Sequence, residues 1–264
     1  MQFIQIGSLR VSKFIIGSNP FSGFSHQGTT RDAEMRHYFS STRIKAVLKE
    51  AESLGVNTII GRADHHMMRL LMEYWDEGGT LKWFGQTCPE VGNHEVCIAR
   101  IADNGARACY IHGGVMDNLL ANNKLAEIPP AIEMIRKRGL LAGVAGHTPA
   151  VFEWAEKNLD VDFYMCSYYN AAHRDKRAEH VSGMPEWFLE EDRQAMIRTI
   201  KGLSKPVIHY KIMAAGRNKP EEAFPVAAKA MRSGDAVCVG IFPKEDASIL
   251  RKDVKLLDSA LAGK

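Results

Sequence analysis

Short apolar segments alternate with longer amphipathic segments along the whole of this 264-residue sequence. Helical periodicity follows the apolar segments, for example in 43–54, 118–138, 150–158, 185–203, 220–232 and 246–261. The apolar segments predict eight strands, at 13–17, 56–60, 81–86, 106–111, 140–145, 162–166, 206–210 and 236–240. Alternating strands and helices form a parallel sheet, because parallel neighbours need crossover helices. We therefore predict one α/β domain over residues 1–264, a (β/α)8 TIM barrel, which needs about 250 residues.

Charge and cysteine content narrow the class of function. The 34 Lys and Arg residues against 31 Asp and Glu residues give a net charge of +3, without a block of like charge. We therefore expect neither nucleic acid nor a membrane surface as a partner, and a small-molecule substrate instead. The five cysteines are odd in number and scattered, which is typical of a reducing compartment. With no signal-peptide pattern and no apolar stretch of about 18 residues, a cytoplasmic protein is expected.

Two connections that follow predicted strands are unusually long. Residues 18–41 follow the first strand, and residues 167–184 follow the sixth. Loops beyond about 12 to 15 residues are usually functional or disordered. Because both lie at the carboxyl ends of strands, where barrel active sites lie, we interpret them as lids or walls of a substrate site. A disordered insertion is the alternative for each.

The histidines are placed unevenly along the predicted elements. All ten lie at the carboxyl ends of strands, or in the loops and first turns that follow. The period of two in 205–212 places His209 and Lys211 on one face, which we assign to the barrel interior because the other face is apolar. The same parity turns His112 and His147 inward at the ends of the fourth and fifth strands. One inward histidine could equally be a core residue, but three on nearby strands predict a site.

Two chemistries are open to such a histidine site. Three imidazoles with an open position are typical of a catalytic divalent metal, so His112, His147 and His209 are the predicted ligands of zinc, manganese or a similar ion. The metal-free alternative is acid–base chemistry on a carbonyl group. Its candidate catalytic residues are His112, His209, Lys211, His65 and Asp64. Lys211 would pair with a substrate anion or form an imine.

Polar and aromatic residues in the long connections are candidates for substrate binding. Aromatic rings stack on the apolar faces of sugars, and polar groups beside them bind hydroxyls or a carboxylate. The predicted substrate-binding residues are Asn19, His26, Tyr168, Asn170, Arg174 and Arg217. The alternative for the aromatic residues is that they only pack the loops against the barrel.

Several segments resemble the aldo/keto reductase superfamily. Residues 4–23 (IQIGSLRVSKFIIGSNPFSG) resemble its N-terminal hairpin and first strand, and 46–60 (AVLKEAESLGVNTII) its first helix and second strand. Residues 108–117 (ACYIHGGVMD) resemble its fourth strand, and 237–257 its final strand and helix, where that family binds the adenosine phosphates of its cofactor. The resemblance implies a (β/α)8 barrel with an N-terminal hairpin-like segment.

The family's catalytic tetrad is mostly absent from this chain. The segment 58–68 (TIIGRADHHMM) has no tyrosine, and 85–90 (GQTCPE) has no lysine. Only His112 matches a member of the tetrad. Because the tyrosine is the proton donor and the lysine lowers its pKa, the usual reduction lacks its acid. The resemblance therefore implies the fold, and NAD(P) is disfavoured relative to a divalent metal.

These observations favour an enzyme that acts on a small polyhydroxylated or keto, sugar-like substrate. The chemistry would be histidine-based acid–base catalysis, with or without a divalent metal, in an isomerase, lyase or hydrolase. One alternative is an NAD(P)-dependent oxidoreductase like the aldo/keto reductases, with a rearranged proton donor. Another is a non-catalytic barrel that binds a sugar-like ligand. A homo-oligomer is compatible with the fold, but no segment identifies an interface.

Overall fold

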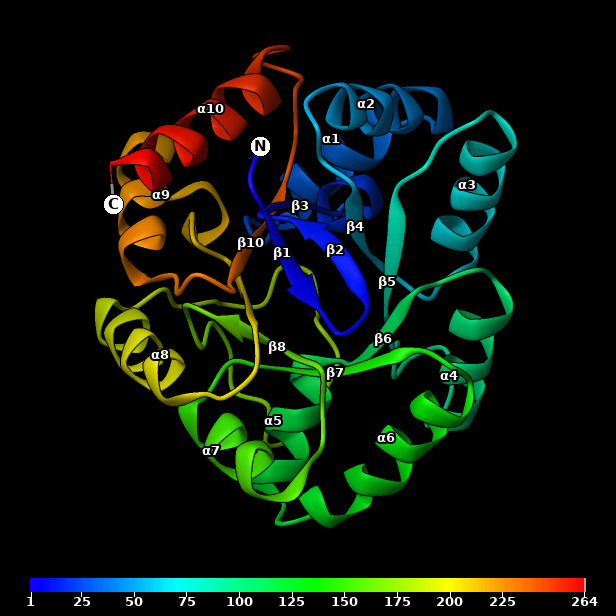
Figure 1. Ribbon diagram of the computed structural model, residues 1–264, viewed down its shortest axis with the longest axis vertical. Helices are drawn as coiled ribbons and strands as arrows, with labels where there is room; N and C mark the ends of the chain where they lie inside the picture. Colours follow the sequence, from blue (N-terminus) through cyan, green and yellow to red (C-terminus); the bar gives the residue numbers. More distant parts are fainter. Residues whose placement is uncertain (264) are drawn as a thin grey trace.

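A computed structural model describes residues 1–263, in which eight parallel strands close into a barrel (Figure 1). The strands follow one another around the barrel in chain order, and the last pairs with the first. They are β3 (Phe14–Gly17), β4 (Thr58–Arg62), β5 (Lys82–Gln86), β6 (Ala108–Ile111), β7 (Leu141–Gly146), β8 (Phe163–Ser167), β9 (Val207–Tyr210) and β10 (Ala236–Gly240). All eight predicted strands and the (β/α)8 barrel are confirmed.

Helices form a ring outside the barrel (Figure 1). They are α1 (Thr29–Tyr38), α2 (Ser41–Ser53), α3 (His65–Asp76), α4 (His94–Asp103), α5 (Gly113–Ala121), α6 (Ile128–Lys137), α7 (Pro149–Asn158), α8 (Glu190–Gly202), α9 (Pro220–Ala230) and α10 (Ile249–Ala262). Short 3-10 helices lie at Asn19–Ser22, Leu125–Glu127 and Ala214–Gly216. Within residues 1–263, none of the helices is long and apolar enough to span a membrane.

One predicted helix is wrong. The segment 118–138 is not continuous, because α5 ends at Ala121 and α6 begins at Ile128. Asn123 adopts a left-handed conformation with φ of 57°, which a helix cannot contain. Pro129 and Pro130 then fall in the first turn of α6, where a missing backbone donor costs nothing.

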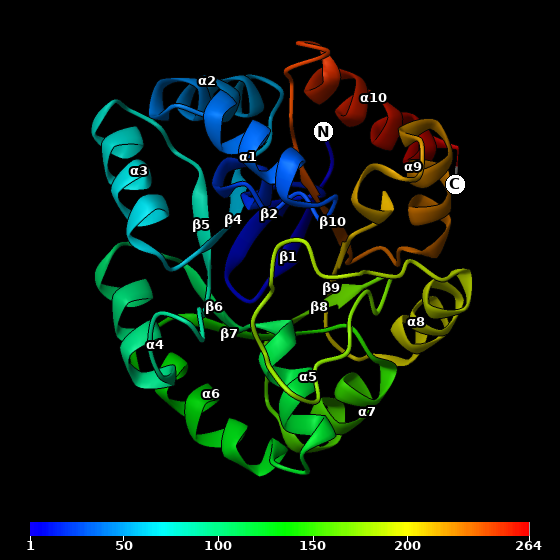
Figure 2. The ribbon, with the colours of Figure 1, turned by 180° about the vertical axis from the view of Figure 1, so that it is seen from behind.

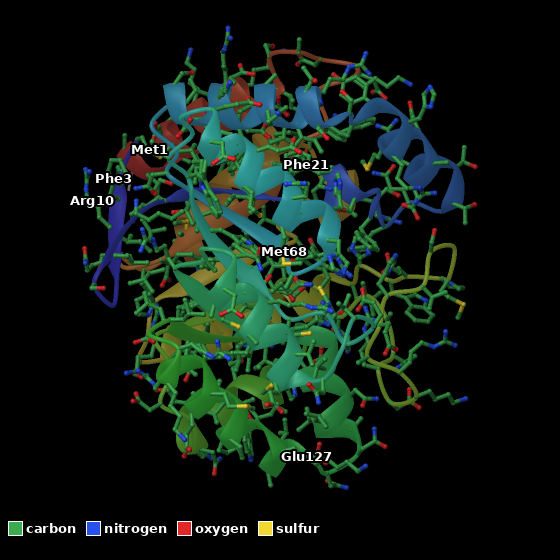
Figure 3. All side chains as sticks on the ribbon, turned by 90° about the vertical axis from the view of Figure 1, so that its right-hand side faces the viewer. Met1, Phe3, Arg10, Phe21, Met68 and Glu127 are labelled. Carbon is green, nitrogen blue, oxygen red and sulfur yellow. The ribbon has the colours of Figure 1, made fainter. Side chains whose placement is uncertain are left out.

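An antiparallel hairpin covers the amino-terminal end of the barrel. Its strands are β1 (Phe3–Ile6) and β2 (Leu9–Ser12). Ile6 and Val11 are fully buried and pack in one cluster with barrel-lining side chains such as Phe84. Figure 3 places the labelled Phe3 and Arg10 of this hairpin at one end of the molecule, opposite the long connections. The predicted N-terminal hairpin is confirmed, and the barrel interior therefore opens only at the carboxyl ends of the strands.

The two long connections cross the open end of the barrel (Figure 2). The connection after β3 contains α1, whereas residues 168–189 after β8 contain neither helix nor strand. Asp32 of α1 joins the two, because its carboxylate accepts hydrogen bonds from Ser25 in the first connection and from Ser182 in the second. We call residues 18–28 the first loop and residues 168–189 the second loop.

The tightness of the barrel interior gives a test of the fold. A Cβ atom at Gly143 of β7 would lie 2.5 Å from the ring of Phe163, which is fully buried. We expect Gly143→Ala to lower the free energy of unfolding by about 1–3 kcal/mol, as overpacking of a core does. Gly202→Ala is the matched control, because no atom lies within 4 Å of its added Cβ. Urea unfolding followed by circular dichroism measures both, and equal stability of the two variants would contradict the packing described.

Candidate active site

A cavity of about 310 Å³ lies at the carboxyl ends of the strands. Every barrel strand contributes to its walls, with Gly17, Ile60, Gln86, Tyr110, Ala145, Met165, Tyr210 and Cys238 among the lining residues. The first loop adds Phe24 and His26, and the second loop adds Arg174 and His180. The cavity occupies the end at which barrel enzymes hold their active sites.

A buried chain of hydrogen bonds runs from α5 to the cavity. The carboxylate of Asp117 accepts hydrogen bonds from the backbone N of His147 at 3.2 Å and from the hydroxyl of Thr148 at 2.9 Å. It also lies 2.6 Å from Nδ1 of His147. A carboxylate can only accept, so Nδ1 carries the hydrogen and Nε2 is left as an acceptor. The hydroxyl of Tyr210 lies 3.3 Å from this Nε2 and 3.3 Å from the carbonyl of Gly146.

The protonation states of this chain follow from its burial. Burial lowers the pKa of His147, although the neighbouring Asp117 opposes the shift. Burial also raises the pKa of Tyr210 well above its usual range. At neutral pH the imidazole is therefore neutral and the phenol holds its proton. Asp117, His147 and Tyr210 thus place a protonated phenol, in contact with a neutral imidazole and the carbonyl of Gly146, at the wall of the cavity.

His112 presents a second neutral imidazole to the same cavity. It follows β6 directly, and its backbone N donates to the hydroxyl of Thr87 at 3.0 Å. Burial lowers the pKa of His112 well below the usual value, and the neighbouring His147 and Arg174 act in the same direction. Its Nδ1 atom is buried and has no hydrogen-bond partner within residues 1–263. Because the side chain of His112 lines the cavity, its neutral imidazole can act as a base toward a bound molecule.

Lys211 brings a positive charge into the cavity. Its φ of 57° lies in the left-handed region and ends β9. The side chain lines the cavity, although strand parity after the inward Tyr210 would turn it outward. Burial lowers the pKa of Lys211 to about 8, and nearby Glu186 opposes the shift. The amine is thus mostly protonated at pH 7, and with Arg174 and Arg62 it makes the cavity suited to an anionic group.

The assignment of His209 to the barrel interior is wrong. Ile208 and Tyr210 face the interior, whereas His209 is fully buried in the layer between barrel and helices. Its Nδ1 lies 3.0 Å from the hydroxyl of Tyr168, and its Nε2 lies 3.3 Å from the carboxylate of Asp235. The barrel interior needs apolar side chains as much as the outer layer does, so an apolar face does not identify the outside. The predicted metal ligands His112, His147 and His209 therefore do not converge.

Two further catalytic candidates lie outside the cavity. Asp64 caps α3 by accepting from the backbone N of Met67 at 2.9 Å, and it pairs with Arg62 at 3.1 Å. His65 is the exposed first residue of α3. Neither is among the residues that line the cavity. Asp64 is accounted for by helix capping and an ion pair.

Of the predicted substrate-binding residues, some line the cavity and others lie outside it. Asn19, His26 and Arg174 line the cavity. Arg217 lines a smaller adjoining cavity and donates to the carbonyl of His26 at 3.2 Å. Tyr168 is buried against His209, and the backbone N of Asn170 donates to Asp192, so these two lie behind the wall.

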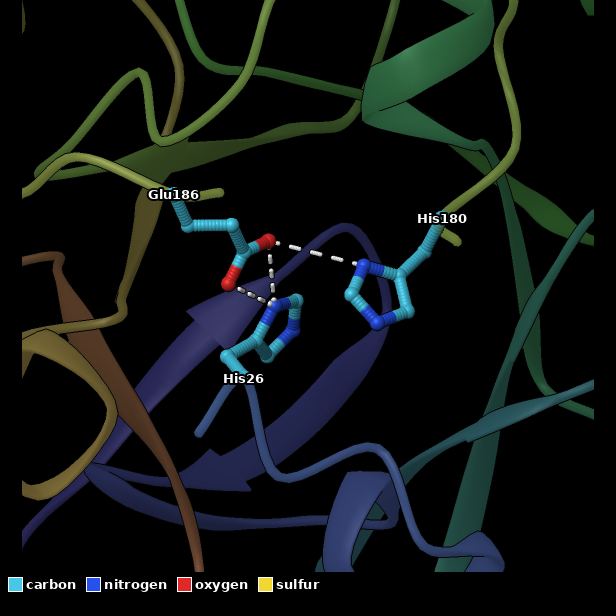
Figure 4. Close-up of side chains that lie close together, drawn as sticks. All are labelled: His26, His180 and Glu186. Carbon is cyan, nitrogen blue, oxygen red and sulfur yellow. Dashed lines mark hydrogen bonds and ion pairs between the residues drawn. The ribbon is translucent and has the colours of Figure 1, made fainter. Parts of the chain in front are cut away.

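Several site residues were not predicted from the sequence. They are Asp117, Tyr210, Gln86, Tyr110, His180 and Glu186. Tyr110 donates to Gln86 at 2.8 Å on the cavity wall. Within residues 1–263, one group of three metal-ligating side chains has its ligand atoms within 4.8 Å of one another, namely His26, His180 and Glu186 (Figure 4). Strand parity in the sequence does turn Tyr110 toward the barrel interior. No pattern in the sequence predicts that His26 of the first loop meets His180 and Glu186 of the second.

Comparison with known proteins addresses the fold. Neither the protein-family models nor the curated proteins that were searched match the sequence. A solved structure from Pseudomonas aeruginosa, provisionally named an aldo-keto reductase, has a TM-score of 0.68 at 16% identity, over 98% of this chain and 96% of that one. The chain shares the fold of that reductase-like barrel. The predicted resemblance to aldo/keto reductases is thus confirmed as a resemblance of fold.

Other barrels match more loosely. A truncated 3-deoxy-D-arabino-heptulosonate 7-phosphate synthase from Thermotoga maritima has a TM-score of 0.56 at 13% identity, over 98% of this chain and 90% of that one. The N-acetylmannosamine-6-phosphate 2-epimerase from Clostridium perfringens has a TM-score of 0.51 at 14% identity, over 81% of this chain and 86% of that one. At these identities the comparisons concern the fold alone.

The lowered pKa of Lys211 gives a test of the cavity's electrostatics. We expect its amine to react with acetic anhydride with a midpoint near pH 8, because burial destabilises the ammonium form. Lys137, whose side chain is exposed, is the control in the same sample. Peptide mass spectrometry of trace-labelled protein measures both lysines in one sample. A midpoint for Lys211 equal to that of Lys137 would contradict the buried site.

Asp253 of α10 gives a test at the far side of the cavity. It is 2% exposed, and burial, followed by repulsion from Glu221 and Asp246, raises its pKa to about 7. In the unfolded chain the Asp253 side chain has the ordinary pKa of about 3.9. Between about pH 4 and pH 7 the folded protein therefore binds this proton more tightly than the unfolded chain does, so the free energy of unfolding falls as pH rises through that range. Asp253→Asn should therefore be more stable than the wild type at pH 8, by up to about 4 kcal/mol, since one pKa unit is about 1.4 kcal/mol.

The control for that variant is the exposed Asp76→Asn. Urea unfolding at pH 4 and pH 8 gives the difference between each variant and the wild type. The stabilisation by Asp253→Asn should vanish at pH 4, and Asp76→Asn should show no such dependence. A difference for Asp253→Asn that is the same at both pH values would contradict the raised pKa.

Proposed function

We propose that this protein is an enzyme that moves a proton next to the carbonyl group of a small polyhydroxylated substrate bearing an anionic group. The observation that carries the proposal is the chain from Asp117 through His147 to Tyr210, which ends at the same cavity as His112 and Lys211. A positioned acid and a positioned base at neutral pH are what proton transfer beside a carbonyl requires. Isomerases and lyases of keto and aldo sugars use this chemistry.

Each group has a role in such a reaction. His112, whose side chain lines the cavity, is the candidate base that removes a proton from the carbon beside the carbonyl. Tyr210 is the candidate donor to the carbonyl oxygen, for which its O–H would turn from Nε2 of His147 and the carbonyl of Gly146 toward the substrate. The ammonium group of Lys211 would stabilise the enolate oxygen or bind the substrate's anionic group. In an isomerase, His112 would return the proton to the former carbonyl carbon while the hydroxyl of the neighbouring carbon gives its proton back to Tyr210. In a lyase, the base would instead take the proton of the hydroxyl on the β carbon, and the bond between the α and β carbons would break to give an aldehyde and an enolate that Tyr210 protonates on oxygen.

The charge of the cavity supports the anionic substrate class. Lys211, Arg62 and Arg174 all line it, and the carboxylate of Glu186 in the adjoining cavity lies against His26. The names of two barrels of similar fold, a heptulosonate 7-phosphate synthase and an N-acetylmannosamine-6-phosphate epimerase, refer to phosphorylated sugars. Phosphorylated sugars and sugar acids are therefore the first compounds to test.

An oxidoreductase is the second candidate function, and one feature of the cavity favours it. The cavity continues past β10 to Phe242, Ile249 and Asp253, which is farther than the proton-transfer groups need. A buried carboxyl such as Asp253 can accept hydrogen bonds from ribose hydroxyls. Lys244 and Arg31, in contrast, are paired with Glu34, which disfavours a bound 2′-phosphate there. Fluorescence titration separates the candidates, because micromolar binding of NADH would favour the oxidoreductase.

Hydrogen exchange in heavy water tests the proton transfer. The protein is incubated in D2O with a panel of ketose and aldose phosphates and 2-keto sugar acids, and NMR follows the loss of carbon-bound hydrogen. We expect exchange in at least one compound, and a decrease of at least about 100-fold in Tyr210→Phe and in His112→Gln, as loss of a general acid or base produces. Tyr38→Phe, at the end of α1 and not among the residues that line the cavity, is the matched control and should keep the wild-type rate.

Thermal stabilisation by the same compounds separates binding from chemistry. Equal exchange rates in the wild type, Tyr210→Phe and His112→Gln would contradict the proposed roles. Compounds that stabilise the protein but show neither exchange nor turnover would instead favour the non-catalytic sugar-binding barrel.

A further inference from the structure

His26, His180 and Glu186 meet where the two loops close over the cavity. Figure 4 shows His26 coming from the first loop, with His180 and Glu186 coming from the second. Nδ1 of His26 lies 2.8 Å and 2.9 Å from the two carboxylate oxygens of Glu186. Nδ1 of His180 lies 3.5 Å from the nearer of these oxygens. The side chains are only 10%, 15% and 5% exposed, respectively, so the cluster is a buried convergence of residues up to 160 positions apart.

We propose that His26, His180 and Glu186 bind one divalent transition-metal ion, for which zinc is the expected occupant. The three ligand atoms lie within 4.8 Å of one another, so small movements of the side chains would bring them around an ion. Two imidazole nitrogens and one carboxylate oxygen are ligands of catalytic zinc sites and of non-haem iron sites. The site differs from the one predicted from strand histidines, since it lies in the loops.

One buried nitrogen in the cluster supports a ligand role. Nε2 of His180 is buried and has no hydrogen-bond partner within residues 1–263. Buried polar atoms are nearly always hydrogen-bonded, so an imidazole whose second nitrogen is unpartnered is unusual for a residue that only packs a loop.

The hydrogen bonds inside the cluster would rearrange when an ion binds. The carboxylate of Glu186 can only accept, so Nδ1 of His26 carries the hydrogen of the bond between them. Coordination through Nδ1 of His26 would move this hydrogen to Nε2, which changes the tautomer of the ring and leaves its net charge unchanged.

Both positive and negative side chains surround the cluster of His26, His180 and Glu186. Lys211 faces it from β9, and Arg217 lies against the carbonyl of His26. Asp32 of α1 lines the same small cavity as Glu186, and its carboxylate is bonded to Ser182 of the second loop. The two carboxylates offset the two cations, so a divalent ion would meet no net positive charge from these four side chains.

An ion at this place would touch both the cavity and the loops that cover it. His26 and His180 line the main cavity, while Glu186 lines the adjoining one of about 230 Å³. Three protein ligands leave at least one coordination position for an oxygen atom of a bound molecule. The ion would also crosslink the first loop to the second. Neither consequence depends on the proton transfer proposed above, so the metal site can be tested without a substrate.

Calorimetric titration of chelator-treated protein with zinc tests the site. We expect one equivalent to bind per chain in the wild type. Glu186→Gln and His180→Asn should bind at least about tenfold more weakly, because changes even to groups behind metal ligands weaken binding about 10- to 100-fold. The exposed His66→Asn is the matched control and should bind as the wild type does. Circular dichroism without metal checks that each variant folds.

A structural readout completes the test. Trypsin is the probe, because Lys176 and Arg177 of the second loop are exposed and we expect cleavage after them. Zinc should slow this cleavage at least fivefold in the wild type and in His66→Asn. It should leave the rate in Glu186→Gln unchanged, because that variant lacks a ligand through which the ion would add a further link between the loops. Zinc binding of equal stoichiometry and affinity in the wild type, Glu186→Gln and His180→Asn would overturn the proposal, as would no zinc binding by the wild type.

Discussion

Closure of the barrel between β10 and β3 brings the carboxyl ends of eight strands around one cavity. Four residue pairs, from Val237 with Phe14 to Gly240 with Gly17, form this closing contact. The hairpin fills the opposite end with Ile4, Ile6 and Val11. Polar groups at the strand ends can therefore lie only in the cavity or behind its wall. This constraint brings Tyr210 to His147, 63 residues earlier in the chain, and gives the hydrogen-bond chain its geometry.

The sequence predicted the framework because buried parallel strands leave a direct signal. Each is a short, nearly continuous apolar run, and helical periodicity follows it. Strand parity also placed His147 beside the small inward residues Ala145 and Gly143, and the structure has His147 at the cavity. Parity failed for β9 because both faces of a barrel strand are buried. The pattern in Val207–Tyr210 therefore could not say which face meets the helices.

The other site residues are brought together by contacts that leave no periodic pattern in the sequence. His209 binds Tyr168 and Asp235, at separations of 41 and 26 residues, and only the fold reveals that these partners hold it outside the interior. Asp117 was missed because the predicted helix began at residue 118, whereas α5 begins at Gly113. A Cβ atom at Gly114 would lie 2.1 Å from the carbonyl oxygen of Ala178, so the second loop passes directly over this helix start. The sequence marked both loops as unusual but could not pair His26 with Glu186.

The central claim is that burial keeps His147 neutral, while Asp117 holds its hydrogen on Nδ1 and leaves its Nε2 turned to Tyr210. Nitrogen-15 NMR of histidine-labelled protein measures this most directly, because the shifts of the two ring nitrogens report tautomer and charge. We predict a single neutral Nδ1–H form of His147 between pH 6 and pH 8, which Asp117→Asn converts to a mixture of tautomers. A His147 that titrates near its ordinary value of about 6.5, or that exchanges freely between tautomers in the wild type, would contradict the account.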